Sequence, residues 1–107
     1  MSRKIQYHPD LYLGEGISEK KLDKIKAELD KHPLLSGAWL ITISQNRYDQ
    51  LEILQARQLE QRYYEKYPVE VVGIAAGYEE AVAVVEKIVQ GCLASRGDCA
   101  LKEYLLC

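Results

Sequence analysis

The sequence of 107 residues contains no phenylalanine and only 3 cysteines, and it has no long uninterrupted hydrophobic segment. A membrane-spanning helix needs roughly 20 consecutive apolar residues, and a signal peptide needs an apolar core near the N-terminus. Charged or polar residues interrupt every apolar run before either pattern is reached. We therefore expect a soluble, cytoplasmic protein with no membrane partner.

Charge of one sign is not in excess either. The 14 Lys and Arg residues are balanced by 16 Asp and Glu residues, which leaves a formal net charge of -2. Nucleic-acid-binding proteins concentrate positive charge on one segment or face, and this chain does not. The composition therefore argues against nucleic acid as a partner.

The residues that bind metals or form disulfides are also poorly placed. Cys92, Cys99 and Cys107 lack a Cys-x-x-Cys pair, and an odd number of cysteines cannot close into a disulfide framework. His8 and His32 lie in different segments, without a neighbouring ligand at a metal-binding spacing. We expect free thiols in a reducing compartment, no metal site and no cofactor.

The chain does contain enough apolar residues for one core. A hydrophobic content of 48% over this length fits a single domain spanning residues 1–107. The clearest local signal is the segment 69–76, which is apolar except for Glu70 and is followed by Gly77 and an amphipathic helix over 78–96. Such a strand, turn and helix requires a sheet with a helix packed on it, so the fold class is α/β or α+β.

Local signals define most of the other elements. A strand is expected over 5–13, interrupted near Pro9, and a helix is expected from the capping residue Ser18 to the residue before Pro33. The β-branched segment 38–44 indicates a second strand. After the long helix, Gly97 predicts its C-terminal cap, and Asp98 predicts the cap of a last helix over 99–106.

The segment 49–66 admits two interpretations, which give two topologies. Either 51–54 is a strand followed by a helix over 55–66, or one helix runs from 49 to 66. The first gives an α+β (mixed α/β) compact two-layer domain with the order β-α-β-β-α-β plus C-terminal helices. The second gives a three-stranded, mostly parallel, doubly wound sheet. Alternation of apolar residues over 51–53, with turn residues over 46–49, favours the first.

Polar residues near two strand ends form a candidate ligand site. Gly14 and Gly16 lie between a strand and a helix, where backbone amides can bind phosphate, but the dinucleotide and P-loop patterns are incomplete and Glu15 would repel an anion. In either topology the first two strands are predicted to run parallel, joined by the first helix, so their carboxyl ends meet at one edge of the sheet, a common ligand site. That edge would collect Glu15, Gln45, Asn46, Arg47 and Tyr48.

The predicted helix over 55–66 carries aromatic residues that are typical of protein interfaces. Glu60 and Glu65 cancel much of the nearby positive charge, which favours a protein partner over nucleic acid. Short strands also leave sheet edges to protect, so we expect a homodimer or another protein partner. The predicted contact residues are Leu59, Tyr63, Tyr64 and Tyr67.

Several short segments together resemble a group of small uncharacterised bacterial α/β proteins. The resemblance supports a strand over 51–54 and implies no particular activity. The segments that carry it are Asp10-Leu11-Tyr12, Leu40-Ile41-Thr42, Gln50-Leu51-Glu52-Ile53 and Val72-Gly73-Ile74-Ala75-Ala76-Gly77 with Glu80-Ala81.

None of the polar residues has the acid, base or nucleophile neighbours that catalysis requires. The sequence therefore predicts a non-enzymatic binding, regulatory or protein-interaction module. The alternative is a small-molecule sensor or small enzyme that uses the edge formed by 14–17 and 45–49.

Overall fold

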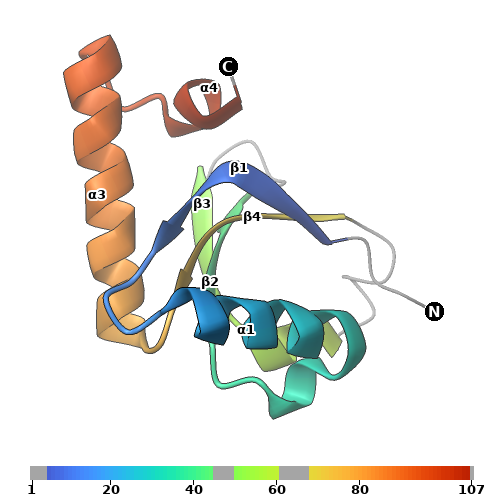
Figure 1. Ribbon diagram of the computed structural model, residues 1–107. Helices are drawn as coiled ribbons and strands as arrows, with labels where there is room; N and C mark the ends of the chain where they lie inside the picture. Colours follow the sequence, from blue (N-terminus) through green and yellow to red (C-terminus); the bar gives the residue numbers. More distant parts are fainter. Residues whose placement is uncertain (1–4, 45–49, 61–67, 107) are drawn as a thin grey trace.

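The computed structural model describes residues 5–44, 50–60 and 68–106, which form a mixed sheet of four strands with helices packed on it (Figure 1). The strand order is β1-β4-β2-β3, in which β4 is parallel to β1 and antiparallel to β2, and β3 is antiparallel to β2. The α+β class is confirmed, and 51–54 is part of a strand. The strands are β1 Ile5–Leu13, β2 Trp39–Ile43, β3 Leu51–Gln55 and β4 Val69–Ala75.

Strand β4 explains why helices cover both faces of this sheet. Its neighbouring residues Val71 and Val72 point to opposite faces, and both are fully buried. Helix α1, Glu19–Lys31, packs on the Val71 face, and helix α3, Tyr78–Arg96, packs on the Val72 face (Figure 1). The domain therefore has three layers, which corrects the two layers predicted. The sequence signal was the uninterrupted apolar segment 71–76, since a strand buried on both faces lacks the alternation of a half-exposed one.

The predicted interruption of the first strand is confirmed. Strand β1 pairs with β4 at Tyr7 and again at Tyr12, and the register shifts between them. Pro9 lies in the unpaired stretch, where its missing N–H removes no ladder hydrogen bond. The irregular stretch turns His8 away from strand pairing and toward the C-terminal helix.

The helix ends follow the capping rules. Ser18 Oγ accepts a hydrogen bond of 3.2 Å from the N–H of Lys21 at the start of α1, and Pro33 opens the 3₁₀ turn η1, Pro33–Leu35, just beyond its end. Helix α3 ends at Gly97, whose φ of 78° lies in the left-handed region that favours glycine. These boundaries are as predicted.

Two predicted helices differ from the observed ones. After β3 the chain forms the 3₁₀ helix η2, Ala56–Glu60, and the rest of the helix predicted over 55–66 lies outside the described residues. The last helix, α4, covers Leu101–Leu106, two residues shorter than predicted. Its start is shifted because Asp98 Oδ1 accepts from the N–H of Ala100, which forms a turn before the helix begins. No helix in the described part of the chain is long and apolar enough to cross a membrane.

Candidate functional site

The predicted polar edge depends on the relative direction of β1 and β2. Both strands pair with β4, but in opposite senses, so β1 and β2 are antiparallel and the prediction that they run parallel is wrong. The chain after β1 lies next to the end of β4, where Gly14 N donates to Ile74 O at 2.9 Å. Ser44, which follows β2, lies at the opposite end of the sheet. The two strand ends do not meet, because β1 and β2 run in opposite directions and so end at opposite edges of the sheet.

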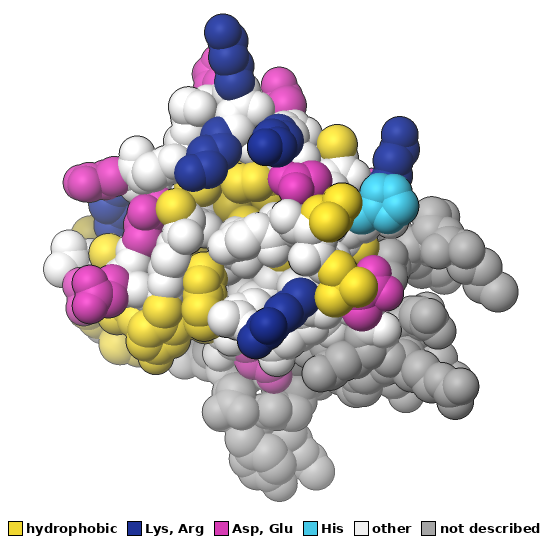
Figure 2. Space-filling model, turned by 90° about the horizontal axis from the view of Figure 1, so that it is seen from below, with side chains coloured by type: hydrophobic (Ala, Val, Ile, Leu, Met, Phe, Trp, Pro, Cys, Tyr) yellow, Lys and Arg dark blue, Asp and Glu magenta, His cyan; other side chains and the backbone are white. Residues whose placement is uncertain are grey.

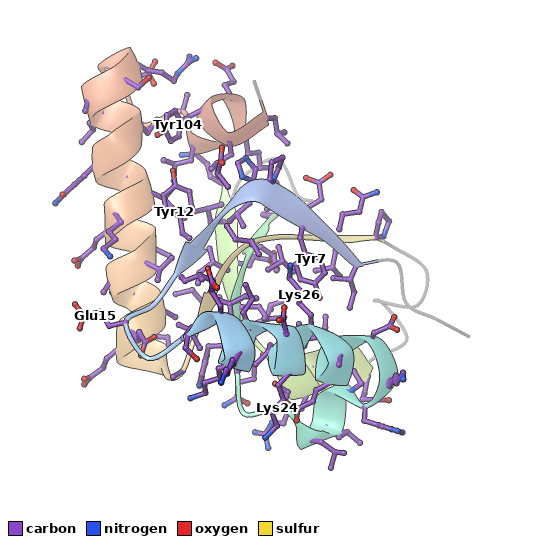
Figure 3. All side chains as sticks on the ribbon, in the orientation of Figure 1. Tyr7, Tyr12, Glu15, Lys24, Lys26 and Tyr104 are labelled. Atoms are coloured by element: carbon purple, nitrogen blue, oxygen red, sulfur yellow. The ribbon has the colours of Figure 1, made fainter. Side chains whose placement is uncertain are left out.

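The residues proposed for that edge are therefore not brought together by the strand directions. Glu15 is exposed in the turn after β1 (Figure 3). The other members of the predicted set, Gln45, Asn46, Arg47 and Tyr48, lie outside the described residues.

The glycine turn after β1 holds a carboxylate of the chain itself. The N–H of Gly16 donates a hydrogen bond of 2.9 Å to Glu80 Oε1, from the first turn of α3. A side chain at Gly14 would overlap the same carboxylate. The backbone N–H groups of Gly14 and Gly16 therefore already donate hydrogen bonds to acceptors of the same chain.

The predicted interface residues are only partly covered by the structure. Leu59 is fully buried in the core with residues of α1 and β4, so its side chain is not on the surface that a partner would contact. Tyr63, Tyr64 and Tyr67 lie outside the described residues.

Cys92 and Cys99 are free thiols, the first buried and the second exposed. Burial raises the pKa of the Cys92 thiol, and the nearby Asp98 carboxylate raises it further. Over the described ranges, no group of three or more His, Cys, Asp and Glu side chains is placed to hold a metal ion. Of the two described thiols, Cys99 is therefore the one that a reagent in solution can reach.

A surface that the sequence analysis missed surrounds the turn η1. Leu34 and Leu35 are 66% and 72% exposed, while the preceding Pro33 is buried and anchors the turn. The ring of Trp39 lies 5.4 Å from the ring of Tyr78 in an edge-to-face arrangement, and Tyr78 is itself 56% exposed. Figure 2 views the molecule from this end and shows hydrophobic side chains reaching the surface between charged ones.

A shallow hollow connects these apolar groups to a positive charge. Leu34 and Trp39 line it together with Arg57. Arg57 Nε donates to Gln55 Oε1 at 2.8 Å, which fixes the guanidinium at the rim, and it forms no ion pair with a described residue. We call Leu34, Leu35, Trp39, Arg57 and Tyr78 the η1 surface. Its sequence signal is the Pro-Leu-Leu segment that follows the end of α1.

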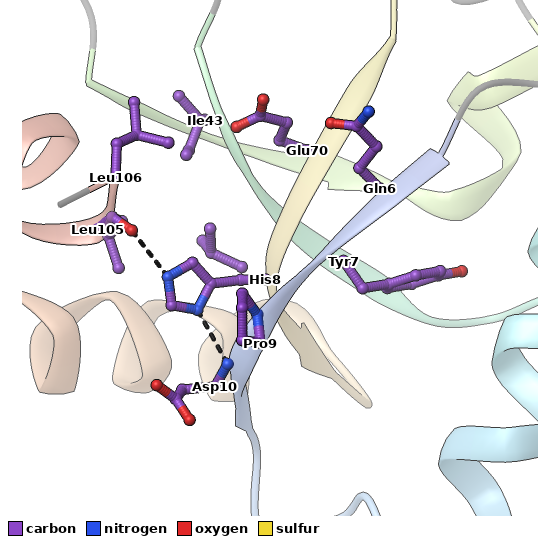
Figure 4. Close-up of a pocket in the computed structure, with 10 residues that line it drawn as sticks. Gln6, Tyr7, His8, Pro9, Asp10, Ile43, Glu70, Leu105 and Leu106 are labelled. Carbon is purple, nitrogen blue, oxygen red and sulfur yellow. Dashed lines mark hydrogen bonds between the residues drawn. The ribbon is translucent and has the colours of Figure 1, made fainter.

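A second concave feature lies between the sheet and α4, and we call it the α4 cleft (Figure 4). Its volume is about 450 Å³. His8 Nε2 donates to Leu105 O at 2.8 Å, and His8 Nδ1 accepts from the N–H of Asp10 at 3.1 Å. These two bonds require a neutral ring with its hydrogen on Nε2. The lining residues are Gln6, Tyr7, His8, Pro9, Asp10, Ile43, Glu70, Val72, Leu105 and Leu106.

No family model matches the chain, and searches of the curated proteins and of the solved structures found no match. The resemblance to small bacterial α/β proteins therefore stays a prediction. Any function has to be supported by the geometry of the η1 surface and the α4 cleft.

Proposed function

We propose that this protein is a non-enzymatic interaction module and that it binds a partner protein through the η1 surface. The observation that carries the proposal is the exposure of Leu34 and Leu35 beside the Trp39–Tyr78 pair. Isolated exposed leucines are common on protein surfaces, but an apolar group rimmed by polar residues marks an interaction site. Here two leucines and two aromatic rings lie at the same end of the molecule.

The residue types and their rigidity support the same interpretation. Tryptophan, tyrosine and arginine are the side chains that most often dominate the binding energy of protein interfaces. Trp39 and Tyr78 support one another, and Gln55 holds Arg57, so these groups lose little side-chain entropy on binding. A complementary partner would place an apolar side chain in the hollow between Leu34 and Trp39 and a carboxylate on Arg57.

The described polar groups give less support to an enzyme. Both ring nitrogens of His8 are already engaged with backbone atoms. The hydroxyl of Ser44 donates to Glu52 at 3.2 Å, a nucleophile beside an acceptor, but Ser44 is only 4% exposed. A substrate carbonyl could not reach that hydroxyl without opening the sheet edge, so the pair supports a structural role.

Affinity purification of the full chain tests the proposal. The double variant Leu34→Asp, Leu35→Asp places two charges on the η1 surface without removing a buried group. Leu93→Asp is the matched control, because Leu93 is an exposed leucine on α3. We expect a partner that co-purifies with the wild type and with the control but not with the double variant, and that binds the purified wild-type chain with measurable affinity.

The same variants distinguish a foreign partner from a second copy of this chain. Light scattering after size exclusion would show a homodimer near twice 12.2 kDa, which the double variant should convert to monomer. The proposal is contradicted if the double variant retains every partner and the oligomeric state of the wild type.

A further inference from the structure

The α4 cleft combines the size and the lining of a small-molecule site. Its volume of about 450 Å³ falls within the roughly 300–1,000 Å³ that is typical of such sites. Ile43, Val72, Leu105 and Leu106 supply apolar walls. Among the described lining residues the ionisable acids are Asp10 and Glu70, and none is Lys or Arg. The described lining of the cleft is therefore partly apolar, and the acids are its only Asp, Glu, Lys or Arg side chains.

Glu70 and Gln6 form the polar end of this cleft. They are direct register partners on the parallel strands β4 and β1, so their side chains project from the same face of the sheet (Figure 4). Glu70 is half-buried beside Ile43, and within the described chain neither Glu70 nor Gln6 makes a side-chain hydrogen bond or ion pair. A carboxylate that has lost part of its water shell without gaining a partner raises the free energy of the folded chain. A bound cation would remove that cost.

His8 serves this cleft as a wall and not as a ligand group. Its two nitrogens are committed to Leu105 O and to the N–H of Asp10, which leaves the ring face exposed to the cleft. The bond to Leu105 also ties α4 to the edge strand β1. Among the described carboxylates and amides of the lining, the acceptors that remain for a ligand are those of Glu70, Gln6 and Asp10, and Glu70 is the more buried of the two acids.

We infer that the α4 cleft binds a small primary amine with an apolar body. An ammonium group donates three hydrogen bonds, and two of them would go to Glu70 and Gln6. The apolar body would lie against Ile43 and Leu106. A metal ion is less suited, because no group of three ligating side chains occurs in the described chain, and an anion would be repelled by Glu70 and Asp10. This inference is independent of the η1 surface, which lies around another end of the fold.

Titration of the full-length, ¹⁵N-labelled protein with hexylamine tests the inference. We expect saturable shifts of the backbone amides of Gln6, Glu70, Leu105 and Leu106. Hexan-1-ol, which has the same alkyl chain without the charge, should bind at least about tenfold more weakly, because it forms no ion pair with Glu70 and donates one hydrogen bond where an ammonium group donates three. Hexanoate should not bind.

Two variants identify the carboxylate responsible. Glu70→Gln should weaken hexylamine binding at least about tenfold, whereas Glu79→Gln, which removes an exposed acid in the first turn of α3, should leave it unchanged. Gln6→Ala should weaken it several-fold and provides a second test on an exposed position. Thermal unfolding verifies that each variant is folded. Equal binding of hexan-1-ol and hexylamine, undiminished binding by Glu70→Gln, or no saturable shift with hexylamine would each overturn the inference.

Discussion

The backbone N–H of Gly16 donates a 2.9 Å hydrogen bond to the carboxylate of Glu80, 64 positions along the chain. Strands β1 and β4 are parallel neighbours, so their carboxyl ends lie side by side, and this bond joins the turn after one to the helix after the other. A side chain at Gly14 would overlap the same carboxylate, although the backbone of Gly14 does not have a positive φ. Position 14 therefore favours glycine because a Cβ atom would overlap the Glu80 side chain, and not because the backbone needs a positive φ.

This geometry predicts a non-additive pair of substitutions. Gly14→Ala should lower the free energy of unfolding by about 1–2 kcal/mol, because the new methyl group displaces the Glu80 carboxylate and breaks its bond to Gly16. In a Glu80→Ala background the same change should be neutral or stabilising by about 0.5 kcal/mol, since alanine restricts the unfolded chain more than glycine does. Urea unfolding of the four proteins gives the coupling directly.

The control for that cycle is Gly37→Ala, because nothing lies within 4 Å of a Cβ at Gly37. It should have the same small effect with and without Glu80. Additive behaviour of Gly14→Ala and Glu80→Ala would contradict the proposed overlap.

A second long-range contact fixes the start of α4. The Gln50 side chain donates from Nε2 to Cys99 O at 2.8 Å, and its Oε1 accepts from the N–H of Leu101, the first residue of the helix. Gln50→Ala should therefore cost about 1–3 kcal/mol of stability, because it removes both hydrogen bonds that join the Gln50 side chain to the start of α4. Amide exchange should accelerate in α4 more than in α3.

Gln90→Ala is the matched control, because Gln90 is an exposed glutamine within α3. It should leave the exchange rates of α4 unchanged. Equal protection of α4 in the wild type and in Gln50→Ala would show that the Gln50 contact does not hold the helix.

These two contacts mark the boundary between what the sequence predicted and what it did not. The cap at Ser18, the stop before Pro33 and the left-handed Gly97 all act within a few residues, so local rules placed the ends of α1 and α3. The alternation of Leu51 and Ile53 likewise identified β3. The start of α4 has a local turn at Asp98, but it also depends on Gln50, which is remote in sequence, and no local rule could supply that second contact.

The candidate site was harder to predict than the fold. The polar edge assumed that β1 and β2 run parallel, but the order of strands is decided by non-local pairing, and β4 takes the place between them. The η1 surface was missed because exposure cannot be read from hydrophobicity: Leu34 and Leu35 have the same side chain as the buried Leu29. Glu70 was missed because its apolar surroundings come from β2 and α4.

The two described cysteines should differ in reactivity. Burial raises the pKa of the Cys92 thiol, whereas Cys99 is exposed, and the thiolate is the reactive form. During timed alkylation with iodoacetamide, we expect Cys92 to react at least about tenfold more slowly than Cys99 in the folded protein, and at a similar rate in urea. Peptide mass spectrometry separates the two sites. Equal rates in the folded protein would mean that Cys92 is accessible.

Tyr12 and Tyr104 form a pair whose titration is measurable (Figure 3). A hydrogen bond to Tyr104, followed by burial, raises the pKa of Tyr12 from 10.0 to about 12. Because the folded state holds the phenol proton more tightly than the unfolded state, the stabilisation is complete below pH 10 and is lost as the pH rises toward 12. Tyr104→Phe removes the partner, so it should lower the pKa of Tyr12 and weaken this pH dependence.

NMR of ¹³Cζ-labelled tyrosine resolves the individual rings, and Tyr78→Phe is the control because Tyr78 contacts Trp39. A wild-type Tyr12 that titrates at its ordinary pKa of 10.0 would contradict the pairing.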